Sequence, residues 1–207
     1  MLSEKETTRR SKLLSLVLRH NPAHIGISLD EQGWVAVPAL LAQLAKHQQP
    51  LTFEQLAFIV ETNAKQRFRF NNDRSRIRAS QGHSVEVELG YPPVAPPKLL
   101  YHGTAVQHQQ AILRDGLRKM ARQHVHLSAD LATARTVGRR HGRLVVFEVA
   151  AGVMQQAGCL FYQADNSVWL TDELPAASAS AGRSQLAVCN TVRARIVNCI
   201  VSTWGGF

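Results

Sequence analysis

A proline-rich stretch near the middle of the chain limits what the chain can fold into. Residues 90–98 read Gly-Tyr-Pro-Pro-Val-Ala-Pro-Pro-Lys, and four prolines in so short a segment remove amide donors and fix an extended backbone. Regular structure therefore stops here. We expect a first domain over residues 1–90, a linker over 91–98, a second domain over 99–175, and a tail over 176–207 of unassigned role that could add a strand.

The first domain carries signals for three helices. The leucine-rich segment 13–18 predicts a helix that ends near Asn21-Pro22, because the residue before a proline is pushed out of the helical region. Pro38 begins a second helix. Thr52, which forms a capping-box pattern with Gln55, begins a third.

A hairpin is predicted after these helices. Residues 67–70 and 74–79 alternate basic and apolar side chains on either side of Asn71-Asn72-Asp73, a typical turn sequence. Three helices followed by a basic hairpin predict a winged-helix-like module.

The second domain mixes short apolar runs with helical patterns. The run Leu-Val-Val-Phe-Glu-Val at 144–149 is typical of a buried strand, and Gly116 is placed to end a helix. The fold class we predict for the whole chain is α+β. The expected strands are 99–102, 124–128, 143–150, 159–162 and 168–171, and the expected helices are 106–115 and 131–140.

The charge balance indicates a polyanionic partner. Lys and Arg number 24 against 15 Asp and Glu, so the net charge is +9 and the pI about 10.1. Basic surfaces gain association rate and affinity from phosphate chains, so RNA, DNA and anionic membranes all remain open. No segment approaches the roughly 18 consecutive apolar residues of a membrane span, and no apolar signal region follows the charged start. We expect a soluble, cytoplasmic monomer.

Six short blocks each place a cation or an imidazole where a phosphate could bind. Arginine is always charged and its planar fork of donors matches phosphate oxygens, whereas histidine can also move a proton near neutral pH. Together they predict a phosphate-handling enzyme. The three cysteines lack paired Cys-x-x-Cys spacing, so no metal site is expected. The blocks are Leu18-Arg19-His20, Lys65-Gln66-Arg67-Phe68, Gln81-Gly82-His83-Ser84, His102-Gly103-Thr104, Arg122 and Val125-His126-Leu127-Ser128.

Each block also has a purely structural explanation. A basic pair at a helix C-terminus interacts favourably with the helix dipole, and alternating arginines on a hairpin usually form a solvated face. Gly103 could serve a bend with Thr104 capping the next helix, and His126 could be a satisfied core histidine. The joint occurrence and order of the blocks favour the functional interpretation.

The ordered motifs resemble one known family, the NAD-dependent RNA 2′-phosphotransferases, from about Ser11 to Leu174. The chain differs at Ser80, where the family often has asparagine, and at Ser167, where it often has glycine. The resemblance implies a winged-helix-like RNA-binding lobe followed by an ADP-ribosyltransferase-type NAD lobe. The motifs that carry it are Leu-Arg-His-Asn-Pro, Gln-Gly-Trp-Val, Lys-Gln-Arg-Phe, Arg-Ala-Ser-Gln-Gly-His-Ser, Leu-Tyr-His-Gly-Thr, Val-His-Leu-Ser and Asn-Ser-Val-Trp-Leu-Thr.

The resemblance also implies roles for individual residues. The family's catalytic Arg-His-Arg-Arg set falls on Arg19, His20, Arg67 and Arg122. Its NAD-pocket motifs fall on His102, Gly103, Thr104, His126, Leu127 and Ser128. The residues that we expect to contact RNA are Lys65, Arg69, Arg78 and His83.

The implied reaction removes an internal 2′-phosphate from RNA in two steps, with NAD as co-substrate. The 2′-phosphate displaces nicotinamide to give an ADP-ribosylated RNA, and a neighbouring ribose hydroxyl then attacks phosphorus. The products are RNA with a 2′-hydroxyl, ADP-ribose 1″,2″-cyclic phosphate and nicotinamide, and the usual substrate class is a tRNA-like splicing product. Many ADP-ribosyltransferases use a glutamate that residues 166–171 do not offer. A phosphate monoester is already charged at neutral pH and needs no general base.

Two other functions remain open from the sequence. The protein could ADP-ribosylate nucleic-acid ends as its normal task, in which case nicotinamide would be released without RNA dephosphorylation. It could also be a non-enzymatic winged-helix regulator that binds nucleic acid. A regulator would explain the basic hairpin but would leave the His-Gly-Thr, Val-His-Leu-Ser and Arg122 blocks without a shared purpose.

Overall fold

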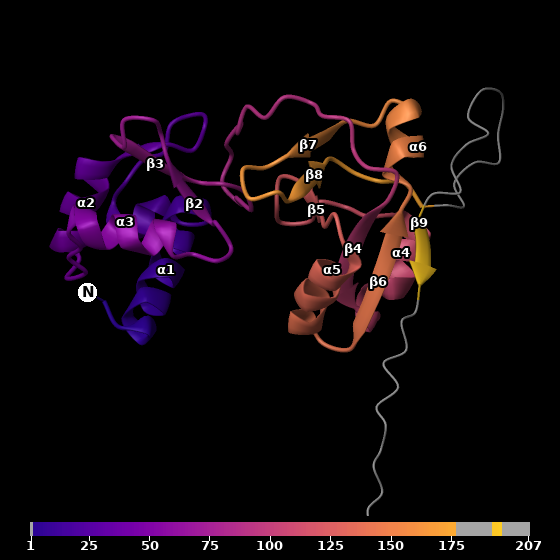
Figure 1. The fold of residues 1–207 in the computed structure, drawn as a ribbon, viewed down its shortest axis with the longest axis horizontal. Coiled ribbons are helices and arrows are strands. Elements are labelled where there is room, and N and C mark those ends of the chain that lie inside the picture. Colours follow the sequence, from indigo (N-terminus) through magenta and orange to yellow (C-terminus); the bar gives the residue numbers. More distant parts are fainter. Residues whose placement is uncertain (1, 177–191, 196–207) are drawn as a thin grey trace, which may run out of the picture. The chain divides into compact units, whose positions relative to one another are not determined.

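The computed structural model describes residues 2–176 and 192–195, and it divides into two compact units (Figure 1). The first unit comprises Met1–Pro92 together with two short segments from later in the chain, Lys119–His124 and Gln163–Ser167. The remaining segments from Pro93 onward form the second unit. The main division between the units falls inside the proline-rich stretch. No sequence pattern indicated that two later segments would pack with the first unit.

The first unit contains three α-helices and a small antiparallel sheet in its described part (Figure 1). The strand order is β1-β3-β2, so the strand that comes first in the chain pairs with the last. Its elements are α1 (Glu4–Arg19), the 3-10 helix η1 (Pro22–Ile25), β1 (Val35–Ala36), α2 (Val37–Lys46), α3 (Phe53–Glu61), β2 (Phe68–Phe70) and β3 (Arg76–Ala79).

The ends of these helices follow from local side-chain chemistry. The hydroxyl of Ser3 accepts a hydrogen bond from the amide of Glu6 at the start of α1, and the helix stops before Pro22. The predicted capping box of Thr52 and Gln55 is confirmed, with both reciprocal hydrogen bonds present. These caps fix where α1 and α3 begin and end.

The core of the first unit is formed by the apolar faces of the three helices and the sheet. Leu14, Val17 and Leu18 of α1 are fully buried, and they belong to one cluster with Leu40 and Ile59. The predicted hairpin is confirmed, since β2 and β3 pair antiparallel from Phe68–Ala79 to Phe70–Ile77. Burial of one face of α1 leaves its other face, with Arg19 at the end, outside this core.

In its described part, the second unit contains two three-stranded sheets (Figure 1). One has the order β4-β6-β9 and the other β5-β8-β7, and a bridge between Tyr101 and Ser128 joins β4 to the end of β5. Its elements are β4 (Leu100–Ala105), η2 (Val106–His108), α4 (Gln109–Asp115), β5 (Val125–Leu127), α5 (Leu131–Gly138), η3 (Arg139–His141), β6 (Leu144–Val149), α6 (Ala151–Gln156), β7 (Phe161–Gln163), β8 (Trp169–Thr171) and β9 (Val192–Arg195).

The predicted α+β class is confirmed, because helices and antiparallel strands both occur in each unit. The strands expected in the second half are present with ends shifted by a few residues, and the short helix α6 was not predicted. A strand from the tail, β9, pairs with β6, whereas residues 177–191 and 196–207 of the tail lie outside the described residues. Within the described residues, no helix combines the length and apolar character needed to cross a membrane.

Candidate functional site

Arg19 and His20 lie at the C-terminal end of α1, where a following loop holds the backbone in place. The carbonyl of Arg19 accepts hydrogen bonds from the amides of Ser84 at 2.9 Å and Val85 at 3.3 Å. An Nη of Arg19 donates to the carbonyl of Arg67 at 3.2 Å. Gly82 has a φ of 86° and no side chain, and its backbone lies against the Arg19 guanidinium. The end of α1, the loop that contains Gly82 and Ser84, and the residue before β2 thus bring Arg19 and Arg67 together.

The imidazole of His20 is oriented by a serine. His20 Nδ1 lies 2.9 Å from Ser84 Oγ, and the amide of the same serine bonds to Arg19. Sequence reasoning singled out the block 81–84 but assigned its role to His83 rather than to Ser84. The spacing gave no means to choose between them.

Positive charges around the site shift two pKa values. Burial, followed by the charges of Arg67 and Arg122, lowers the pKa of Arg19 to about 10, so this guanidinium is still charged at neutral pH. Burial, followed by the charges of Arg19 and Arg122, lowers the pKa of His20 below its usual 6.5, which favours a neutral ring. The neighbours that shift these groups are all cations. A site of this kind favours an anionic ligand.

Arg122 belongs to the first unit, although the sequence placed it in the second domain. It lies in the segment Lys119–His124, and the neighbouring Gln123 donates from Nε2 to the carbonyl of Val85 at 2.9 Å. This contact holds the segment beside the loop that carries Ser84. The charge of Arg122 acts on both Arg19 and His20. All four expected catalytic residues therefore belong to one compact unit.

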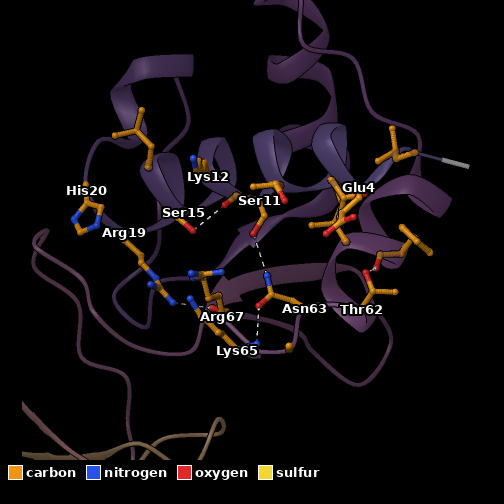
Figure 2. A pocket seen from close by; sticks show the side chains of 17 residues that line it. Glu4, Ser11, Lys12, Ser15, Arg19, His20, Thr62, Asn63, Lys65 and Arg67 are labelled. Carbon is orange, nitrogen blue, oxygen red and sulfur yellow. Dashed lines mark hydrogen bonds between the residues drawn. The ribbon is translucent and has the colours of Figure 1, made fainter. Parts of the chain in front are cut away.

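An open groove of about 930 Å³ extends from this site (Figure 2). Arg19, His20, Lys65 and Arg67 line one part of it, and side chains of α1 and of the end of α3 line the rest. Arg67 is half-buried and Lys65 is exposed. The groove gives a ligand access to the arginines from solvent.

The residues matched to an NAD pocket lie in the second unit, on β4 and β5. His102 Nδ1 donates to the carbonyl of His126 at 3.0 Å, and both imidazoles are half-buried. Ser128 exchanges two backbone hydrogen bonds with Tyr101, at 2.9 and 2.8 Å. His102, His126 and Ser128 are the accessible members of the expected set.

The other three members of that set are interior. Leu127 and Thr104 are buried. A Cβ at Gly103 would lie only 1.8 Å from the carbonyl oxygen of Ala134 in α5, so this position needs glycine for helix packing. The close approach of α5 to β4 therefore gives Gly103 a structural role.

Two of the four residues expected to contact RNA, Arg78 and His83, have buried side chains. Arg78 is 5% exposed, donates to the carbonyls of Gln32 and Leu89, and lies over the ring of Trp34. His83 is 2% exposed. Neither side chain presents a surface to RNA. Lys65 is exposed, and Arg69 is half-buried.

Asp165 is a structural residue of the first unit that sequence reasoning did not identify. Its carboxylate pairs with Arg69 and accepts a 2.6 Å hydrogen bond from Tyr91 Oη. Burial, followed by this hydrogen bond, raises the pKa of Tyr91 to about 12. The next residue also contacts the first unit, since Asn166 Nδ2 donates to the carbonyl of Lys65. Ser167, which follows it, has a φ of 61°. That backbone region favours glycine.

Known proteins resemble this chain over most of its length. A sequence model of the RNA 2′-phosphotransferase, Tpt1 / KptA family matches residues 5–173. The chain is 51% identical over 174 residues to a probable RNA 2′-phosphotransferase of Nostoc punctiforme, covering 84% of this chain and 96% of that protein. It is 54% identical over 169 residues to a protein of the same name from Agrobacterium fabrum, covering 82% and 91%. The chain therefore belongs to the RNA 2′-phosphotransferase family.

Proposed function

We propose that this protein removes an internal 2′-phosphate from RNA and transfers it to NAD, releasing nicotinamide and RNA with a 2′-hydroxyl. The observation that carries the proposal is the grouping of Arg19, Arg67 and Arg122 around His20 in one unit. A phosphate monoester carries up to two negative charges at neutral pH and three acceptor oxygens. Guanidinium groups match those oxygens in charge and in geometry.

The first chemical step requires positioning more than proton transfer. An oxygen of the RNA 2′-phosphate attacks the anomeric carbon of the nicotinamide ribose, and the bond from that carbon to nicotinamide breaks. Because the phosphate is already ionised, no general base is needed to activate it. Arg19 and Arg67 hold the phosphate, and the hydrogen bond from the Arg19 guanidinium to the backbone carbonyl of Arg67 keeps the two residues close together.

The second step concentrates charge on phosphorus oxygens. A hydroxyl of the transferred ribose attacks phosphorus, and the bond from phosphorus to the RNA 2′-oxygen breaks, which closes a cyclic phosphate. The arginines stabilise the charge that develops on the equatorial oxygens. His20, neutral at pH 7 and held by Ser84, is placed to carry the proton from the attacking hydroxyl to the departing 2′-oxygen.

NAD is the proposed co-substrate, and it supplies an anomeric carbon with a good leaving group. The chain's residues that fit it are His102, His126 and Ser128, on adjoining strands of the second unit. Because a carbonyl only accepts, the bond from His102 Nδ1 to His126 fixes the tautomer and makes Nε2 an acceptor when the ring is neutral. An acceptor of this kind suits a ribose hydroxyl.

We further propose that the first unit is a winged-helix-like RNA-binding module and the second an ADP-ribosyltransferase-type module. The element order of the first unit and its β1-β3-β2 sheet support the former. The two sheets of the second unit, joined where β4 meets β5, support the latter. Lys65 and the net charge of +9 suit an RNA ligand.

The experiment combines the protein, NAD and an RNA that carries one internal 2′-phosphate, and follows phosphate loss and nicotinamide release together. We expect equal amounts of both, and none without NAD. Arg67→Ala should slow the reaction about 10²- to 10³-fold. The matched control is Arg114→Ala, which removes an exposed arginine of α4 that pairs with Asp115 and should leave the rate unchanged.

Three results would contradict this function. Nicotinamide release with the 2′-phosphate still on RNA would favour ADP-ribosylation of nucleic-acid ends, and no release at all would favour a binding protein. Loss of activity in a chelator would require a metal. We expect activity to survive the chelator, because the described residues contain no group of three or more His, Cys, Asp or Glu that could hold one.

A further inference from the structure

The groove continues from Arg19 along a polar stripe of α1. Thr8, Lys12, Ser15 and Arg19 follow one another at intervals of four, three and four residues, which places them on one face of the helix. All four line the groove, and Figure 2 labels three of them, Lys12, Ser15 and Arg19. The stripe leads away from the catalytic residues toward the start of α1, where Glu4 also lines the groove.

The opposite wall is built from the loop that follows α3. Asn63 Nδ2 donates to Ser11 Oγ at 3.0 Å, and Asn63 Oδ1 accepts from the amide of Lys65 at 3.1 Å (Figure 2). Gln66 adopts a φ of 43°, which turns the chain sharply between Lys65 and Arg67. The side chain of Asn63 thus ties α1 to the loop that carries two cations of the site.

Lys12 is the cation of α1 that lines the groove and that the proposed reaction does not use. Its side chain is exposed, and no carboxylate pairs with it among the residues that the structure describes. It lies seven residues before Arg19, which is about 10 Å along the helix axis. Two long side chains that far apart can reach two phosphates of the same strand. Leu16, 37% exposed, lines the groove between them and offers an apolar surface to a sugar or base.

We propose that this groove holds the sugar–phosphate backbone beside the 2′-phosphorylated nucleotide, with Lys12 bound to the neighbouring internucleotide phosphate. The placement of the 2′-phosphate at Arg19 rests on the proposed function. The groove is partly open to solvent, so a strand that continues beyond the reacting nucleotide can lie in it. Lys12 is therefore a substrate-binding residue that strengthens binding only of RNA with a neighbouring internucleotide phosphate. It takes no part in bond breaking.

The test measures binding without turnover. A 2′-phosphorylated trinucleotide RNA and a nucleoside 2′-phosphate, which lacks any internucleotide phosphate, are titrated with the full chain in the absence of NAD. Lys12→Ala should weaken trinucleotide binding about five-fold, with no effect on binding of the nucleoside 2′-phosphate. It should also reduce the magnitude of the negative slope of log affinity against log salt by about 0.7 for the trinucleotide. Lys12→Arg should restore trinucleotide binding. Lys46→Ala, at an exposed lysine of α2 outside the groove, is the matched control.

The first four of the following outcomes overturn the assignment, and the fifth tests the proposed function instead. Equal trinucleotide binding by the Lys12→Ala and Lys46→Ala variants would remove Lys12 from the RNA site, and so would failure of the trinucleotide to bind. Weakened binding of the nucleoside would place Lys12 on the 2′-phosphate itself. Weakened binding of NAD, titrated separately, would assign the groove to the co-substrate. Normal trinucleotide results with no turnover after NAD is added would contradict the proposed function and leave the groove assignment standing.

Discussion

A single hydroxyl group, that of Ser84, holds the imidazole of His20. Ser84→Ala removes the 2.9 Å contact to Nδ1 and keeps the backbone bond from residue 84 to Arg19. Because a misplaced catalytic group lowers the rate without weakening the grip on substrate, we expect kcat to fall about 10-fold and the KM for RNA to stay near the wild-type value. Steady-state rates at several RNA concentrations measure this split.

Ser84→Thr is the control, because threonine keeps a hydroxyl at the same distance from the backbone. It should recover most of the lost kcat. An Ala variant with an unchanged kcat would show that His20 is held by other contacts. A raised KM for RNA with normal kcat would place Ser84 on the substrate instead.

At the level of elements, β4 and α5 touch through two glycines. A Cβ at Gly103 would lie 1.8 Å from the carbonyl oxygen of Ala134, and one at Gly138 would lie 2.8 Å from the amide of Thr104. Backbone atoms cannot move aside as a flexible side chain can. Gly103→Ala should therefore lower the free energy of unfolding by about 3 kcal/mol, in the absence of any ligand. Urea unfolding of the free protein measures it.

Gly152→Ala is the control for this prediction, since a Cβ at Gly152 meets nothing closer than 3.3 Å. It should change stability far less than Gly103→Ala. If Gly103→Ala leaves stability unchanged and reduces only activity, the glycine serves a ligand and the packing explanation is wrong.

The elements that the sequence predicted are those with local signals. The capping box of Thr52, the stop before Pro22 and the hairpin around residues 71–73 all depend on residues a few positions apart. The short helix α6 has no cap hydrogen bond from a side chain, and it was missed. Local chemistry fixes an element only where it includes a start or stop signal.

At the scale of the whole molecule, the sequence identified the four candidate catalytic residues but not their arrangement. Arg122 reaches the first unit in a segment that follows Pro92 by more than twenty residues, and Asp165 meets Arg69 across a separation of 96 residues. The alternation of basic and apolar residues on the hairpin suggested an exposed basic face. It could not show that Arg78 lies over the ring of Trp34 and donates to the carbonyl of Leu89. Such contacts depend on tertiary packing, which no local pattern encodes.

His83 makes the stability of the first unit depend on pH. Its ring is 2% exposed, and neither nitrogen has a hydrogen-bond partner among the described residues. Burial, followed by the charges of Arg19 and Arg78, lowers its pKa from 6.5 to about 4. Between these two values the unfolded chain binds the proton and the folded chain does not, so protons favour unfolding. The stability that the neutral ring provides is complete above pH 6.5 and is lost as the pH falls toward 4.

Between pH 7 and pH 4 we expect the protonation of this histidine to lower the free energy of unfolding by about 3 kcal/mol. His83→Gln keeps a neutral side chain of similar size at every pH, so its free energy of unfolding should fall less over the same range, by about that difference. Urea unfolding at both pH values, followed by the far-ultraviolet circular dichroism of the protein, measures wild type and variant side by side. Carboxylates elsewhere titrate equally in both proteins and cancel in the comparison. Parallel losses in wild type and variant would mean that the folded protein admits a charged His83, and that the ring is not enclosed as the structure has it.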